Sequence, residues 1–169
     1  MFNPTKEVPD VGLCKELKRL GFSQKDGCWY WIECEIGGLI KTELVFYKNI
    51  WLTPNCYGSD LYFPVGRGGS AVGIKEYAKA PTIRELGEWL PRAVSLPDMI
   101  DYYLTIVKVD EKWVVRYERV DSFGQLECFI DSGEGDTEAN ARAKMLIWLA
   151  KNGHVKFGDK EDNKNAKEK

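Results

Sequence analysis

The run CWYWIECEI at residues 28–36 alternates strictly between two kinds of side chain, and this pattern constrains the fold more than any other stretch. The first kind comprises Cys28, Tyr30, Ile32, Cys34 and Ile36, and the second comprises Trp29, Trp31, Glu33 and Glu35. A period of two is typical of a β-strand whose two faces meet different surroundings. We therefore expect a strand whose first set faces the core and whose second set is apolar at one end and wet at the other.

The last third of the chain predicts further strands and a helix. Residues 102–109 and 113–120 read as an antiparallel hairpin, and residues 125–130 read as a third strand. The helix predicted at 137–151 has a broad apolar stripe, which consists of Ala139, Ala143, Leu146, Ile147 and Ala150. Gly153 is expected to end it.

The first half adds two helices and shorter strands. A helix is predicted after Asp10, ending at Gly21, and a second begins at the capping box of Thr82 and Glu85. Residues 1–9 read as an irregular lead, and short strands are expected at 43–47 and 62–63. The predicted fold class is α+β, mainly antiparallel sheet with two or three packing helices, in a single domain over 1–157. The charged residues 158–169 are expected to form a disordered tail.

Composition excludes several functional classes. The net charge is −2 with a pI of about 5.6, so the sequence lacks the clustered basic surface of a nucleic-acid binder. No window approaches the roughly 18 apolar residues of a membrane span, and the N-terminal residues do not resemble a signal peptide. We expect a protein of the cytoplasm that binds neither nucleic acid nor membrane.

Metal and histidine chemistry find no support in the spacing. The five cysteines are Cys14, Cys28, Cys34, Cys56 and Cys128, and the single histidine is His154. There is no C-x-x-C pair, and two cysteines six residues apart on one strand lie about 20 Å from each other. We expect reduced thiols, no cofactor, and a histidine that sits at a helix C-terminus for electrostatic reasons.

The segment from Gly66 to Ala71 formally fits the dinucleotide pattern G-x-G-x-x-G/A. That pattern requires a helix directly after it and an acidic residue ending a second parallel strand, and the sequence predicts neither. We interpret residues 65–73 as a mobile surface loop. Arg67 together with the backbone amides of Gly68, Gly69 and Ser70 remains the best candidate for holding a small anion.

The acidic residues indicate neither a calcium site nor an acid–base pair. The run from Asp131 to Asp136 lacks the register of an EF-hand and precedes a helix, where carboxylates cap and interact with the helix dipole. Neither the pair Asp98 and Asp101 nor the pair Asp110 and Glu111 has a sequence context that separates two pKa values, as acid–base catalysis requires.

The aromatic residues admit two interpretations. In the first, which we favour, the helix at 82–90 covers Trp29 and Trp31 with the help of Trp89. In the second, the two tryptophans stay partly exposed and form a recognition patch, since exposed Trp and Tyr are typical of binding hot spots. The other members of that patch would be Trp51, Tyr57 and Tyr62.

Four stretches in the same order carry a family resemblance. They are residues 14–22 (CKELKRLGF), 29–31 (WYW), 80–91 (APTIRELGEWLP) and 137–149 (TEANARAKMLIWL). Together they resemble small uncharacterised proteins of tailed bacteriophages and prophages. The family has no established activity, so the resemblance implies a context, a phage accessory protein in a bacterial cytoplasm, and no site residues.

The Trp and Tyr content, without catalytic equipment, favours a non-catalytic binding protein. The resemblance implies that its partner is a host factor, such as a defence protein, or a nucleotide signal. Two alternatives stay open: a small enzyme that uses carboxylates and Arg67, and a structural accessory protein that self-associates as a homo-oligomer.

Overall fold

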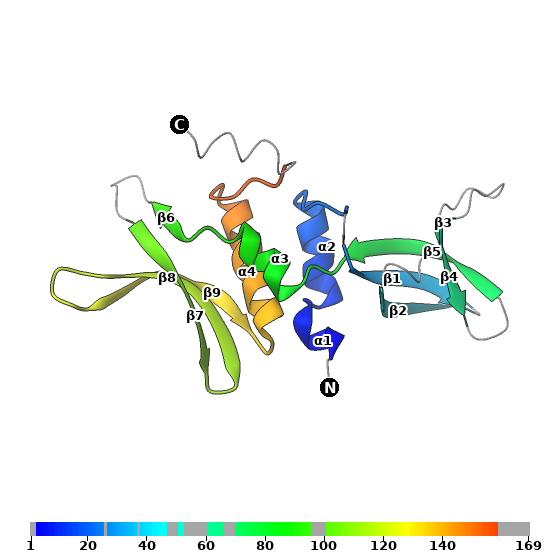
Figure 1. Cartoon of the computed structure of the whole chain (residues 1–169), viewed down its shortest axis with the longest axis horizontal. Coiled ribbons are helices and arrows are strands. Elements are labelled where there is room, and N and C mark those ends of the chain that lie inside the picture. The colour runs from blue at the N-terminus through cyan, green and yellow to red at the C-terminus, as the bar shows by residue number, and fades with distance from the viewer. Residues whose placement is uncertain are drawn as a thin grey trace. The chain divides into compact units, whose positions relative to one another are not determined.

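The computed structural model describes residues 3–25, 27–36, 38–46, 51–52, 61–65, 70–95 and 101–158. It divides the chain into two compact units (Figure 1). Residues 24–80 form one, here called the β unit, and residues 1–23 with 81–169 form the other, here called the mixed unit. The chain passes between the units at residues 23–24 and 80–81. The single domain over 1–157 therefore stays a prediction.

The β unit is an antiparallel sheet with the strand order β2-β1-β5-β4-β3. The strands are β1 (Trp29–Ile36), β2 (Leu39–Phe46), β3 (Trp51–Leu52), β4 (Leu61–Val65) and β5 (Ser70–Lys79). Strand β1 lies inside the sheet and pairs with β2 on one side and with β5 on the other. Its predicted core face is confirmed at Tyr30, Ile32 and Cys34, which are buried. The prediction is wrong for Cys28, which precedes the strand and is exposed.

The glycine-rich segment is shorter than predicted. Residues 70–73, which we expected in a loop, form the start of β5, where Ser70 pairs with Val65 and Ala71 with Pro64. A strand therefore follows the G-x-G-x-x-G/A pattern where a dinucleotide site requires a helix. Residues 66–69 lie outside the described part of the chain.

The mixed unit combines helices with a second antiparallel sheet of the order β6-β7-β8-β9. Its helices are α1 (Pro4–Glu7), α2 (Val11–Arg19), α3 (Ile83–Trp89) and α4 (Glu138–Lys151). Its strands are β6 (Ala93–Ser95), β7 (Asp101–Val109), β8 (Lys112–Val120) and β9 (Leu126–Gly135). Helix α4 packs on β8 and β9 with one side and on α2 and α3 with the other (Figure 1). The α+β class with mainly antiparallel sheet is confirmed.

Helix α4 begins and ends as its sequence predicts. The Thr137 side chain accepts from the Asn140 N–H, and Gly153 follows the last turn with a φ of 78°. The Gly153 N–H donates to the Ala150 carbonyl and the His154 N–H to the Leu149 carbonyl, which together make a Schellman ending. Burial goes beyond the predicted stripe, since three further residues are fully buried: Ala141, Met145 and Leu149. Because other elements cover α4 on two sides, these three positions are shielded from solvent as well.

Two local predictions in the mixed unit are wrong. Residues 4–7, expected to be irregular, form the single turn α1, because the Asn3 side chain caps it and Pro4 occupies its first position. The acidic run at 131–135 is not a capping loop, since it continues β9 as far as Gly135, and Thr137 alone caps α4. None of the described helices is long and apolar enough to cross a membrane.

Candidate functional site

One face of β1 carries the tryptophans that the sequence singles out. Trp29, Trp31 and Glu33 are half-buried, and Glu35, at the far end of the strand, is exposed. Direct partners on the neighbouring strands lie on the same face as the residue they pair with. The register therefore arranges this surface, here called the aromatic–acidic face, in rows that cross β2, β1 and β5.

Two rows of the aromatic–acidic face are apolar. Trp29 pairs with Phe46 of β2, and the two rings meet edge to face with centroids 5.2 Å apart. Trp31 lies between Leu44 and Ala78, and Ala78 is buried. The half-buried tryptophans thus have apolar neighbours on the adjacent strands and still expose part of their surface.

The next row is polar and acidic. Glu33 lies between Thr42 on β2 and Glu76 on β5, so that two carboxylate side chains are direct cross-strand partners. Beyond them Glu35 forms an ion pair with Lys75, at the position where the register of β5 shifts. The face changes from aromatic to acidic within two residues of β1.

A network of hydrogen bonds on the other face of β1 holds the start of the strand in place. The Tyr30 hydroxyl donates to the Gln24 carbonyl at 2.9 Å, and the Gln24 side-chain oxygen accepts from the Lys79 N–H at 2.7 Å. The buried Lys79 side chain donates from Nζ to the Lys25 carbonyl at 3.1 Å. These bonds tie the segment that leads into β1 to the end of β5, so the Trp29 end of the strand is held by both.

The remaining predicted binding residues are only partly described. Trp51 and Tyr62 are direct partners in the β3–β4 ladder, so the structure brings their backbones together. Ser70 opens β5. Tyr57, Arg67, Gly68 and Gly69 lie outside the described residues, and so does the anion site proposed for them.

Trp89, which the covered interpretation assigns to the tryptophans of β1, packs within the mixed unit. Its ring lies 5.7 Å from that of Phe22 and 5.5 Å from that of Phe157. These rings belong to the apolar cluster around α4. Within the β unit, Trp29 meets Phe46 instead.

Groups suited to metal binding do not gather in the described ranges. No three side chains of His, Cys, Asp or Glu converge there. His154 is exposed and stacks on Trp148, with ring centroids 5.6 Å apart and planes inclined by 8°. Burial raises the pKa of the Cys34 thiol, and the nearby Glu43 adds to the shift. A thiol of this kind is a poor nucleophile.

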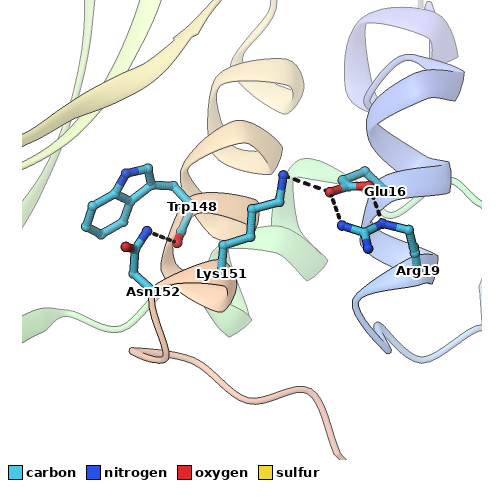
Figure 2. A network of polar contacts seen from close by, with 5 residues as sticks. All are labelled: Glu16, Arg19, Trp148, Lys151 and Asn152. Carbon is cyan, nitrogen blue, oxygen red and sulfur yellow. Dashed lines mark hydrogen bonds and ion pairs between the residues drawn. The ribbon is translucent and has the colours of Figure 1, made fainter.

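A charged network in the mixed unit joins α2 to α4 (Figure 2). The Glu16 carboxylate accepts from the Arg19 guanidinium at 2.7 and 2.8 Å and pairs with Lys151 Nζ at 2.8 Å. These partners lower the pKa of Glu16 to about 2, with Arg19 making the larger contribution. Lys151 reaches Glu16 from the last turn of α4, while Asn152 donates to the Trp148 carbonyl. The network connects the C-terminal part of α2 to the C-terminal end of α4.

The β8–β9 turn presents an apolar tip that sequence reasoning missed. The Asp121 carboxylate accepts from the N–H groups of Phe123 and Gln125, both at 2.8 Å, which builds the turn. Phe123 is 87% exposed, and Val120 and Leu126 beside it are 63% and 64% exposed. The sequence signal for this exposed tip is the turn pattern Asp121-Ser122-Phe123-Gly124, which places an aromatic residue inside a turn.

Comparison with known proteins gives no relative: no family model, no curated protein and no solved structure matches the chain.

Proposed function

We propose that the chain is a non-catalytic binding protein whose aromatic–acidic face takes up a Lys- or Arg-bearing segment of another protein. The observation that carries this proposal is the change from tryptophan to paired carboxylates along one face of β1. A cation over a tryptophan face gains about 0.5–2 kcal/mol, and a neighbouring carboxylate adds a charge-assisted hydrogen bond. Trp31 and the Glu33–Glu76 pair supply both within one surface.

The sign of the charge favours a protein partner over a nucleotide signal. A nucleotide brings phosphate groups, which Glu33 and Glu76 would repel. Lys75, which lies next to Glu76 on β5, is paired with Glu35.

The biological setting follows from the family resemblance of the sequence. We propose a phage or prophage accessory protein that acts in the bacterial cytoplasm, with a host factor, such as a defence protein, as the owner of the basic segment. This setting rests on the four resembling stretches, whereas the chemistry of the partner rests on the aromatic–acidic face.

Titration of the full-length chain with short peptides tests the chemistry. Arg-rich and Lys-rich peptides should bind and change the tryptophan fluorescence, whereas an acidic peptide of equal length and a cyclic dinucleotide should not. Trp31→Ala and the double variant Glu33→Gln/Glu76→Gln should each weaken binding about tenfold or more, and added salt should weaken wild-type binding.

Trp148→Ala is the matched control, because Trp148 is also half-buried but lies in the mixed unit. It should bind the basic peptides like the wild type. If Trp31→Ala binds as well as Trp148→Ala does, or if the dinucleotide binds and the basic peptides do not, the proposal is wrong.

A further inference from the structure

Strand β2 has an open edge. Within the part of the chain that the structure describes, β2 is an end strand of its sheet and pairs only with β1. All residues from Leu39 to Glu43 are exposed, and the apolar Leu39 and Ile40 are 69% and 65% exposed. An edge of this kind is a template for pairing with another strand. Neither a proline nor a bulge blocks it.

The β1–β2 hairpin determines which backbone groups point outward. Ile36 and Leu39 close the hairpin across a two-residue connection, and such a closing pair exchanges its hydrogen bonds. Because bonded and outward positions alternate along a strand, Lys41 and Glu43 also bond to β1. The N–H and C=O groups of Ile40, Thr42 and Leu44 consequently face the open edge.

The exposed sequence of β2 is complementary to itself. When two copies align antiparallel about Thr42, the outward groups of both strands meet, as hydrogen bonding requires. Lys41 of each copy then lies opposite Glu43 of the other, at a position where side chains approach closely. Ile40 of each copy lies opposite Leu44 of the other at a hydrogen-bonded position, which covers apolar surface that the single chain exposes.

The two nearest alignments that also match the outward groups are unfavourable. Centring the pair on Lys41 sets this lysine against its own copy, and centring it on Glu43 does the same with carboxylates. Like charges directly opposite are destabilising, whereas opposite charges stabilise a sheet. A shift by a single residue brings outward groups against groups already bonded to β1. The charge pattern thus selects the alignment about Thr42.

We propose that two copies of this chain associate edge to edge through β2, antiparallel about Thr42, to form one continuous sheet. The two-fold axis of such a pair is perpendicular to the sheet, so the faces that carry Trp31 in the two copies lie on the same side. The association needs no ligand and is independent of what that face binds.

Charge exchange between Lys41 and Glu43 tests the register. In the full-length chain kept under reducing conditions, light scattering and sedimentation should show a reversible dimer that forms as concentration rises. Lys41→Glu and Glu43→Lys should each weaken it at least about tenfold, because each sets like charges opposite each other twice. The double variant Lys41→Glu/Glu43→Lys should dimerise again, since it only exchanges the two positions.

An equimolar mixture of the two single variants gives the sharpest readout. Each variant alone should be monomeric, but the mixture should form a heterodimer in which every charged pair is again attractive. Circular dichroism and unfolding curves should match the wild type in all variants, since both positions are exposed. A wild type that stays monomeric at high concentration, single variants that dimerise like the wild type, or a mixture of folded variants that fails to associate would each overturn the proposal.

Discussion

Gly133 permits the close approach of β9 to its neighbours, and Gly133→Ala should destabilise the mixed unit. A Cβ atom at this position would lie 2.6 Å from the Val115 carbonyl oxygen and 3.0 Å from the Ala141 carbonyl oxygen. The first oxygen belongs to the β8–β9 ladder and the second to α4, so neither can turn aside as a flexible side chain would. Relief requires β9 to move away from β8 or from α4.

The expected loss is large for so small a change. Overpacking a well-packed interior costs about 1–3 kcal/mol, and we expect the upper end because the obstacles are backbone atoms. A loss of about 3 kcal/mol lowers the midpoint of thermal unfolding by roughly 6–12 °C for a chain of this size. Urea unfolding followed by circular dichroism should show a lower midpoint with an unchanged slope.

Two glycines serve as controls for the same substitution. Gly12 lies in α2, and a Cβ there has its nearest neighbour at 3.4 Å, so Gly12→Ala should stabilise by about 0.5–1 kcal/mol. A Cβ at Gly158 meets nothing within 4 Å, and Gly158→Ala should change stability by less than about 0.5 kcal/mol. If Gly133→Ala unfolds at the same urea concentration as Gly158→Ala, the packing argument is refuted.

Three further predictions concern titration, a buried hydrogen bond and thiol reactivity. Because the pKa of Glu16 is held at about 2, below the ordinary carboxyl value of about 4.3, its stabilising contribution is complete above that value and is lost as the pH falls toward 2. Urea midpoints between about pH 5 and pH 2 should therefore fall less in Glu16→Gln than in the wild type; an equal fall would contradict the ion-pair assignment. The buried Tyr117 hydroxyl donates to the Pro91 carbonyl at 2.7 Å, so Tyr117→Phe should cost about 1–3 kcal/mol in urea unfolding, whereas no change would show that water replaces the bond. Under iodoacetamide, peptide mapping should find exposed Cys28 alkylated well before Cys34, whose pKa is raised by burial; equal rates would place Cys34 in contact with solvent.

Elements with a strict period and a cap were predictable because local chemistry determines them. The helix after Thr137, the capping box at Thr82 and the hairpin at residues 102–120 all lie where their patterns indicate. The hairpin turns at Asp110 and Glu111, both with positive φ, so the alternation of the flanking strands set the turn without a glycine signal.

Features that depend on contacts between distant segments were not predictable from local pattern. Gly133 and Gly135 lie in an acidic, glycine-rich run that is typical of loops, yet both belong to β9. Their role appears only when α4 packs on the strand: a Cβ at Gly135 would lie 2.7 Å from the Ala141 N atom. Glycine inside a strand often marks such a close approach of another backbone. The burial of Met145 and Leu149 likewise depends on distant segments, since β8, β9, α2 and α3 all pack on α4.

The candidate site was predictable in part. The pattern of residues 28–36 identified which side chains share the face with Trp31, but it could not supply Glu76, which comes from β5 through the register of the sheet. That residue changes the chemistry of the site, because it places a second carboxylate directly opposite Glu33 on the face that carries Trp31. If the second carboxylate serves binding, Glu76→Gln should weaken the affinity of the protein for basic peptides. A variant that binds basic peptides like the wild type would make the pair a feature of the sheet alone. A variant that loses stability would show that Glu76 is needed for folding.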